Sequence, residues 1–272
     1  MRLPDVLPIV HFNRTTPYRQ PEWIFPGLRA GQVGLLTAPG GTGKSFLLLE
    51  IAFSVASGEP MVNGLIPGAA GPVRVLNFED DEFDLENRGN SILREFADVE
   101  PGENLFVSAL SGYSLGLVDG RGGVSDEDVK WLKKQCDGMR LLILDPLSHC
   151  HCADENSAPM MSKLVQVLKG IGRETGTGIL IAHHTAKAAA LNGQADLQQS
   201  ARGSSALVDA ARVVLTLSKP KDEDNGYVLE LTWAKLNGHA PIQPKRLRRQ
   251  PAGVLVGDRH LLPPKGEVEI DF

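Results

Sequence analysis

The chain has 272 residues, of which 42% are hydrophobic and 22% are charged, and this composition suits one large α/β domain, or one domain with an added arm. The formal net charge of −5 argues against a surface that is basic overall, so a nucleic-acid partner would need a local positive lining such as a channel. The three cysteines, the lack of a secretory leader and the lack of any run of about 18 apolar residues favour a reduced, cytosolic protein without a membrane span.

The N-terminal residues 1–22 carry several prolines and short apolar pieces. This pattern predicts an extended arm that docks on another surface, and a frayed terminus without a function is the alternative. We expect residues 23–260 to form the main domain and residues 261–272 to form a C-terminal tail.

A glycine-rich stretch follows the short apolar run 33–36 and opens onto a predicted helix that ends near Gly58. Strand, glycine-rich loop, Gly-Lys-Ser and helix in this order are typical of a P-loop. Ala38 stands where the strict pattern has its first glycine, and a chance glycine-rich turn is the alternative interpretation. The predicted nucleotide-binding residues are Pro39, Gly40, Gly41, Thr42, Gly43, Lys44, Ser45 and Phe46.

Each part of this loop has a chemical task in a P-loop. The backbone N–H groups and the helix N-terminus can surround phosphate oxygens. Lys44 would reach the β- and γ-phosphates, and the Ser45 hydroxyl would bind Mg²⁺. The sequence therefore predicts a nucleoside-triphosphate site.

The next apolar run, within residues 72–81, predicts a buried strand that we expect near the P-loop strand. Glu79 ends this strand and is the candidate base that polarises an attacking water. Asp80 or Asp81 could cap the helix that follows. A solvated helix start is the alternative for the whole acidic run.

Residues 105–110 predict a short strand, and residues 125–136 predict a helix with acidic residues in its first turn. Residues 140–145 predict a strand in which an uninterrupted apolar run, 141–144, ends in Asp145. This carboxylate is placed to hold Mg²⁺ or its water, and a plain strand-end acid is the alternative. An apolar stripe then predicts a helix over residues 157–175.

The four residues His149, Cys150, His151 and Cys152 invite a zinc interpretation. They are consecutive, so in an extended chain the two cysteines would face one way and the two histidines the other. Tetrahedral zinc needs four converging ligands, usually in spaced pairs, and the sequence therefore disfavours a metal site here.

A third buried strand is predicted over residues 178–182 and ends in His183 and His184. One of the two imidazoles could contact the γ-phosphate, and the other could be a hydrogen-bonded structural histidine. A polar segment over residues 185–202 predicts a loop, followed by a helix over 204–211 and a strand over 212–218.

Turn signals on both sides of residues 227–236 predict antiparallel strands at one edge of the sheet. The densest basic run, residues 245–249, could contact nucleic acid, lie between subunits or form a solvated edge. The whole pattern predicts an α/β fold, with a mostly parallel sheet flanked by helices and antiparallel hairpins at one edge. The P-loop, Glu79, Asp145 and the histidine pair all fall at carboxyl ends of strands, where such sheets bind ligands.

Several motifs together resemble a known family. They are the P-loop, Asn77–Asp80, Leu142–Leu147, His151 with Asp154–Asn156, His183–Lys187 and Ala201–Asp209. In this order they resemble the RepA-type hexameric replicative helicases of plasmids and phages, within the RecA/DnaB-like P-loop ATPases, over about residues 22–256.

The resemblance implies a RecA-like core, ATP or another NTP with Mg²⁺, and a homohexameric ring with its nucleotide sites between subunits. It implies an arginine finger from the neighbouring subunit, for which Arg212 is the best match and Arg202 the second. It also implies that single-stranded DNA is contacted by the loop after the histidine pair, and that the N-terminal arm embraces the adjacent subunit. The DNA-binding candidates in that loop are Lys187, Asn192, Gln194 and Gln198.

Two other functions stay open from the sequence. One is a RecA-like DNA-dependent ATPase that acts in recombination or regulation and unwinds nothing. The other is a nucleotide-binding assembly protein without turnover, which the presence of both Glu79 and Asp145 disfavours.

Overall fold

The computed structural model describes residues 20–184, 205–220 and 226–257. The strands are β1 (Trp23–Phe25), β2 (Leu28–Arg29), β3 (Val33–Ala38), β4 (Val73–Asn77), β5 (Leu105–Ala109), β6 (Leu141–Asp145), β7 (Gly178–His184), β8 (Val213–Ser218), β9 (Val228–Leu236), β10 (Lys245–Arg249) and β11 (Leu255–Gly257). The α-helices are α1 (Lys44–Ser57), α2 (Glu82–Glu95), α3 (Asp126–Cys136), α4 (Ala158–Thr175) and α6 (Ser205–Ala210). Two short 3-10 helices cover Gly102–Asn104 and Leu147–His149.

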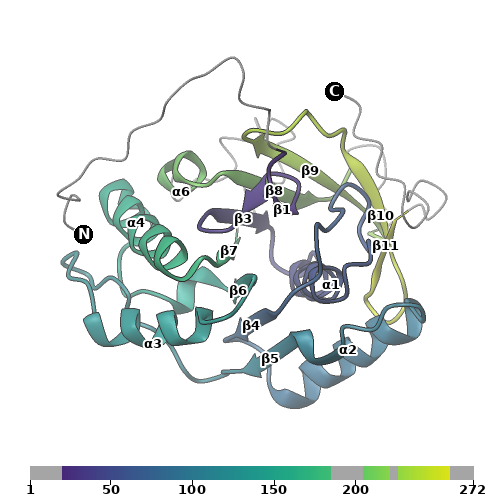
Figure 1. The fold of residues 1–272 in the computed structure, drawn as a ribbon, viewed down its shortest axis with the longest axis horizontal. Coiled ribbons are helices and arrows are strands. Elements are labelled where there is room, and N and C mark those ends of the chain that lie inside the picture. Colours follow the sequence, from purple (N-terminus) through teal and green to yellow (C-terminus); the bar gives the residue numbers. More distant parts are fainter. Residues whose placement is uncertain (1–19, 185–204, 221–225, 258–272) are drawn as a thin grey trace.

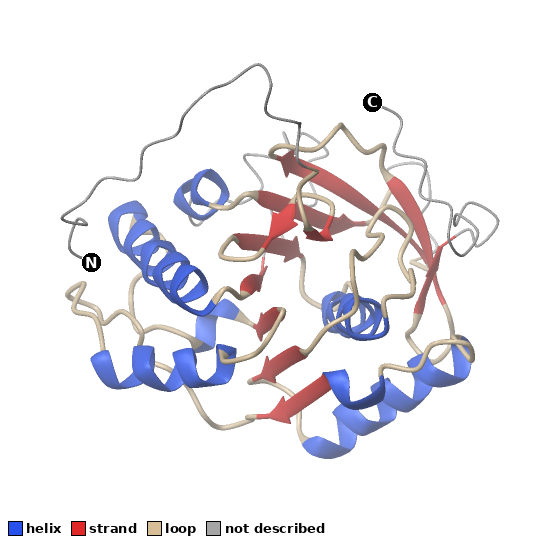
Figure 2. Ribbon diagram, in the orientation of Figure 1, coloured by secondary structure: helices blue, strands red, loops and turns tan. Residues whose placement is uncertain are grey.

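A nine-stranded sheet organises these elements in the order β11-β10-β9-β8-β3-β7-β6-β4-β5. The strands from β8 to β5 in this order are parallel to one another, whereas β9, β10 and β11 pair antiparallel at the other side. Strands β1 and β2 form a separate two-stranded sheet. Helices α1 and α2 lie on one side of the large sheet, and α3, α4 and α6 lie on the other (Figures 1 and 2).

The central parallel strands are rich in buried apolar residues because helices cover both faces of the sheet there. In β6, Leu141 and Ile143 pack into the core under α1, whereas Leu142 and Leu144 pack into the core under α3 and α4. Alternate side chains of a strand point to opposite faces, so one continuous apolar run serves two cores. This arrangement confirms the predicted fold class.

Most predicted elements form close to their expected bounds, and several helix ends follow the expected chemistry. The Asp81 side chain accepts a hydrogen bond from the Asp84 N–H and caps α2, and Ser125 caps α3 in the same way. Gly58 and Gly176 end α1 and α4 in the left-handed conformation.

The predicted neighbourhood of the strand that carries Glu79 is wrong. Strand β4 does not lie beside the P-loop strand β3, because β7 and β6 stand between them. The neighbours of β3 are β7 and β8. A sequence pattern predicts which segments form strands, but the order of strands follows from crossover connections that leave no local signal.

The structure contains short strands that the sequence pattern did not indicate. The β1–β2 pair and the strand character of residues 245–249 and 255–257 were not predicted. The arm at 1–19, the loop at 185–204 and the tail at 258–272 lie outside the described residues. Within the described ranges, no helix has the length and apolar character that crossing a bilayer requires.

Helix α1 carries a glutamate, Glu50, whose carboxyl group is buried in the core. The side chain of Glu50 is fully inaccessible, and its Oε1 accepts a hydrogen bond of 2.7 Å from the Leu255 N–H. The other oxygen, Oε2, has no hydrogen-bond partner among the described residues. Burial raises the pKa of Glu50 well above its ordinary value, against a smaller lowering by the Leu255 N–H.

This group predicts a pH-dependent stability. Because the folded-state pKa is raised, the contribution of Glu50 to stability is complete below the unfolded pKa of about 4.3 and is lost as pH rises through the folded pKa. We expect Glu50→Gln to remove this loss, which amounts to about 1.4 kcal/mol per pH unit across that window. Thermal or urea unfolding of both proteins between pH 4 and 8 measures it.

Glu86→Gln, a change of the same chemistry on the exposed face of α2, serves as the control and is expected to leave the pH profile of the wild-type protein unchanged. Identical pH profiles for Glu50→Gln and the wild-type protein would contradict a raised pKa of the buried Glu50.

Candidate nucleotide site

The P-loop joins β3 to α1 through a tight turn. The Thr42 hydroxyl donates a hydrogen bond of 2.6 Å to the Pro39 carbonyl, which closes the turn. Gly43 has a φ of 98° and precedes the first helical residue, Lys44. A side chain is strained at this φ, which is why glycine is required where the loop turns into the helix. The helix N-terminus therefore faces the concave side of the loop, as a phosphate site requires.

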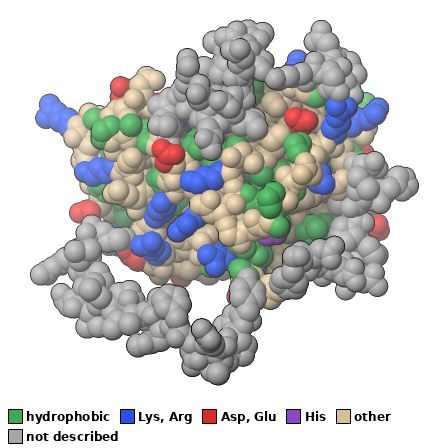
Figure 3. All heavy atoms as spheres, turned by 90° about the horizontal axis from the view of Figure 1, so that it is seen from above, with side chains coloured by type: hydrophobic (Ala, Val, Ile, Leu, Met, Phe, Trp, Pro, Cys, Tyr) green, Lys and Arg blue, Asp and Glu red, His purple; other side chains and the backbone are tan. Residues whose placement is uncertain are grey.

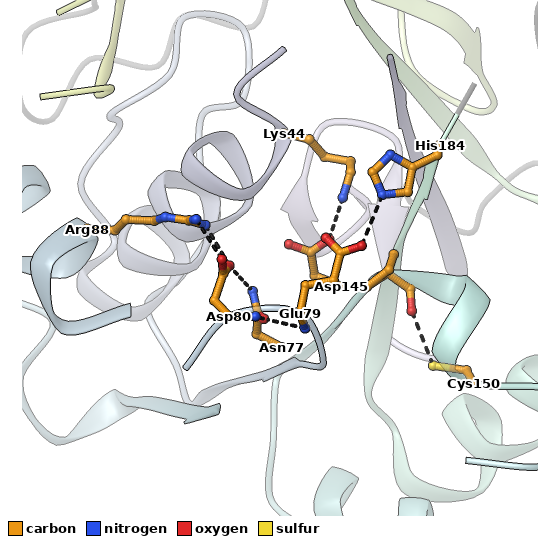
Figure 4. A network of polar contacts seen from close by, with 9 residues as sticks. Lys44, Asn77, Glu79, Asp80, Arg88, Asp145, Cys150 and His184 are labelled. Carbon is orange, nitrogen blue, oxygen red and sulfur yellow. Dashed lines mark hydrogen bonds and ion pairs between the residues drawn. The ribbon is translucent and has the colours of Figure 1, made fainter. Parts of the chain in front are cut away.

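Lys44 and Asp145 form a buried ion pair at the carboxyl ends of the sheet. The Lys44 Nζ atom lies 2.5 Å from Asp145 Oδ1, and the two side chains are 5% and 2% exposed. Asp145 is the last residue of β6, and the Leu142–Leu144 run before it is completely buried. Both predicted phosphate-site residues therefore meet in one place (Figure 4).

The predicted magnesium ligands fit a cation that is held partly by a nucleotide. Ser45 lines the same cavity as Lys44, and Asp145 contacts Lys44 from β6. No group of three or more His, Cys, Asp or Glu among the described residues could hold a metal. Mg²⁺ is commonly bound by one or two protein oxygens together with phosphates and water, so Ser45 and Asp145 suit such an ion.

Glu79 lies on a short turn that a buried asparagine organises. The Asn77 Oδ1 atom accepts hydrogen bonds from the Glu79 N–H at 3.0 Å and the Asp80 N–H at 2.8 Å. The Asn77 side-chain amide donates to Asp80 Oδ2 at 2.9 Å. Asn77 is 2% exposed and pairs in register with Asp145 of β6, so the turn is tied to the ion pair described above. The backbone of the predicted base is thereby held at the edge of the cavity.

Asp80 does not cap α2, contrary to one of the two expectations. Its two carboxylate oxygens accept hydrogen bonds of 2.6 and 2.7 Å from the Arg88 guanidinium. The cap is Asp81 alone. The bidentate pair with Arg88 and the contact with Asn77 occupy the Asp80 carboxylate, which explains why it is unavailable to the helix end.

The structure separates the two histidines of the predicted pair. His184 Nε2 lies 3.4 Å from Glu79 Oε1, and both side chains are about two-fifths exposed. His183 is buried, and burial lowers its pKa. Because consecutive side chains on a strand face opposite ways, only His184 lines the cavity.

A cavity of about 300 Å³ contains the predicted site. It is lined by Pro39, Gly41, Gly43, Lys44, Ser45, Phe46, Glu79, Asp80, Arg88, His184, Arg249 and Gly253. Arg88, Arg249, Gly253 and the buried Asn77 behind the turn were not predicted. The Asn-x-Glu spacing at a strand end could have indicated Asn77, whereas Arg88 and Arg249 reach the cavity through packing alone.

The predicted arginine finger lies far from the cavity of its own chain. Arg212 precedes β8, and its N–H donates to the carbonyl of Val33, the first residue of β3. The P-loop begins beyond Ala38, at the other end of β3, which has six residues. A strand of this length spans roughly 20 Å, so Arg212 lies at the opposite edge of the sheet. The alternative for Arg212 from the sequence is a strand-end residue paired with Asp209, and the ion pairs found among the described residues do not include that pair.

Other basic side chains surround Arg212. Burial, followed by the positive charges of Arg212, Lys235 and Arg173, lowers the pKa of Lys169. The Lys235 ammonium donates to the carbonyls of Val208 and Asp209 at the end of α6. Figure 3 views the molecule from the side of α6 and β9, and Lys and Arg side chains gather on that face.

The second candidate finger, Arg202, and the DNA-binding candidates Lys187, Asn192, Gln194 and Gln198 lie outside the described residues. Their predicted roles are therefore untested.

The expected arrangement of the His149–Cys152 segment is wrong. Cys150 is completely buried and Cys152 is exposed, so the two cysteines do not share a face. The chain is not extended here, because residues 147–149 form a 3-10 turn. His149 stacks on Phe78 at 6.2 Å, and His151 Nδ1 lies 3.1 Å from the Ala153 carbonyl oxygen.

The chain belongs to the AAA domain family, whose profile matches residues 2–190. This match agrees with the P-loop geometry and makes the protein a nucleotide-binding P-loop ATPase.

Solved structures show the same fold at low sequence identity. The ATPase domain of G40P has a TM-score of 0.59 and 14% identity, over 84% of this chain and 85% of that one. A DnaB-like replicative helicase, solved to show its interactions with primase, has a TM-score of 0.59 and 14% identity, over 84% of this chain and 57% of that one. The RadB recombinase has a TM-score of 0.51 and 15% identity, over 84% of this chain and 91% of that one. The fold is therefore the RecA-like P-loop ATPase fold.

The Asn77 contacts generate a prediction about turnover. Asn77→Ala removes the acceptor that fixes the Glu79 and Asp80 N–H groups, so the turn that carries the Glu79 carboxylate loses its support. We expect kcat for ATP hydrolysis to fall by about ten- to a hundredfold, with ATP affinity little changed. Steady-state kinetics and ATP titration measure the two quantities.

Asn90→Ala, on the exposed side of α2, is the matched control. An unchanged kcat in a folded Asn77→Ala protein would contradict the positioning of Glu79 by Asn77.

Proposed function

We propose that this protein is a RepA-type, ring-shaped helicase that uses NTP hydrolysis to move along single-stranded DNA in plasmid or phage replication. The observation that carries the proposal is the meeting of Lys44, Asp145, Glu79 and His184 at one edge of a RecA-like sheet. Likeness to a G40P ATPase domain and to a DnaB-like replicative helicase supports it, as does the order of motifs in the sequence.

Each residue of the cavity then has a task in hydrolysis. The loop N–H groups and Lys44 hold the phosphates, and Lys44 exchanges Asp145 for phosphate oxygens when the nucleotide binds. Ser45 and Asp145 would hold Mg²⁺, which supplies charge neutralisation on the β- and γ-phosphates. Glu79 accepts a proton from the attacking water, and the Asn77 turn keeps its carboxylate in place.

His184 connects the reaction to the following segment of the chain. It contacts Glu79 and is the last residue of β7, immediately before residues 185–202. A shift of Glu79 during hydrolysis would move His184 and hence this segment. In the proposal, Lys187, Asn192, Gln194 and Gln198 of this segment contact single-stranded DNA. One lysine per subunit is a thin positive lining, but a ring of six copies concentrates it.

The arginine finger comes from the neighbouring subunit. Arg212 lies at the edge opposite its own P-loop, so it can serve only the site of another copy. Its basic surroundings suit a phosphate-bearing partner site. Arg202 is the second candidate for the same role. A homohexamer closes such head-to-tail contacts into a ring.

A second candidate function is a RecA-like DNA-dependent ATPase that acts in recombination or regulation without unwinding. The likeness to the RadB recombinase favours it. Electron microscopy with ATP and DNA distinguishes the two, because closed rings support the helicase and filaments support the second function.

Mixing inactive variants tests the shared site. We expect Lys44→Ala to abolish ATP hydrolysis and Arg212→Ala to lower it by about a thousandfold or more. In a mixed ring, an Arg212→Ala subunit keeps its P-loop, and a Lys44→Ala neighbour supplies an intact arginine. The mixture should therefore regain part of the activity, measured as phosphate release.

Arg173→Ala, on the same basic face, controls for a general loss of positive charge. Retained turnover by Lys44→Ala would overturn the site, and mixing that restores nothing would count against an arginine acting between subunits.

A further inference from the structure

The basic run at residues 245–249 has no task in the function proposed above, and its side chains divide between two environments. It forms β10, between β9 and β11. Leu247 is completely buried and Arg249 is half-buried, whereas Arg248 is exposed. Alternate residues of a strand face opposite ways, so Arg249 shares the face of Leu247 that points toward the core under α1.

Arg249 reaches the P-loop from this position. Its Nη2 atom donates a hydrogen bond of 3.2 Å to the Gly41 carbonyl. A Cβ atom added to Gly43 would lie 2.9 Å from the same nitrogen, so the guanidinium rests directly on the loop. The Arg249 Nε atom is buried and has no hydrogen-bond partner among the described residues. Within the described part of the chain, Arg249 therefore has an N–H group without an acceptor beside the phosphate loop.

Arg249 differs from the other cations that line the cavity in its ion pairing. Lys44 is paired with Asp145, and Arg88 is paired with both oxygens of Asp80. Among the residues that the structure describes, Arg249 is the lining cation without a carboxylate partner. A guanidinium that has no carboxylate partner and has an N–H without an acceptor can donate two parallel hydrogen bonds to a phosphate group.

The next turn of the chain packs the β10–β11 hairpin against α1. Gly253, between β10 and β11, packs so closely on the Phe46 ring that an added Cβ would collide with it. Phe46 is the third residue of α1 and directly follows Ser45. The hairpin that carries Arg249 is thus seated against the helix that begins at the phosphate loop.

We propose that Arg249 is a second nucleotide-binding cation of the same subunit, which contacts the phosphate chain beside Lys44. In this role it exchanges the Gly41 carbonyl for phosphate oxygens when a nucleotide binds, and it couples the β10–β11 hairpin to the occupied loop. The inference rests on the proposed NTPase function and adds a binding residue that the P-loop pattern does not contain.

Calorimetric titration of the full chain with Mg²⁺ and the non-hydrolysable ATP analogue AMP-PNP tests this. We expect Arg249→Ala and Arg249→Gln to raise the Kd by about tenfold or more, and Arg249→Lys to recover part of the affinity. The Km for ATP should rise in parallel, with kcat changed by less than about threefold. The stabilisation of each Arg249 variant by saturating AMP-PNP, measured as a Tm shift, should shrink accordingly.

Arg248→Ala is the matched control, because it removes the same charge from the exposed side of the same strand. The proposal is overturned if Arg249→Gln binds AMP-PNP as tightly as the wild-type protein, or if Arg248→Ala weakens binding equally. A wild-type protein that binds no nucleotide would overturn the NTPase function as well, whereas normal binding by Arg249→Gln alongside loss of hydrolysis in Lys44→Ala would overturn only the role of Arg249.

Discussion

The buried ion pair between Lys44 and Asp145 is the contact on which the site depends. It joins the P-loop to the end of β6 across the intervening strand β7. A pair this deeply buried gains little net stability, because desolvation offsets much of its Coulomb attraction. The ion pair matters because it fixes the positions of the two side chains. It holds the Lys44 ammonium where a phosphate can bind it and the Asp145 carboxylate where Mg²⁺ can bind it. The parallel sheet makes this possible by bringing the carboxyl ends of its strands to one edge.

A set of polar contacts extends from this ion pair to Glu79 and His184, which line the cavity. Asn77 pairs in register with Asp145 and bonds the backbone of the turn that carries Glu79. Glu79 contacts His184, the last residue of β7. One connected set of contacts thus runs from the phosphate loop to the segment that follows β7. The proposed function requires such a path, because it links ATP hydrolysis to movement along DNA. The proposed site between subunits likewise requires Arg212 to lie away from its own P-loop.

The sequence predicted what short-range patterns determine. The P-loop, Asp145 and the fold class followed from apolar runs and turn residues. The alternation of His183 and His184 could have been predicted too, because the period of a strand alone puts them on opposite faces. The place of β4 and the approach of Arg249 to Gly41 could not, since strand order and long-range packing leave no local signal. The basic run 245–249 was ambiguous for the same reason.

Steady-state ATP hydrolysis by the full chain, with and without single-stranded DNA, is the decisive experiment for the proposed motor. A motor whose catalytic glutamate communicates with a DNA-contacting segment through His184 must hydrolyse ATP faster when that segment holds DNA. We therefore expect single-stranded DNA to raise the rate of ATP hydrolysis. A rate that is the same with and without DNA would contradict the motor and leave a P-loop ATPase of another function.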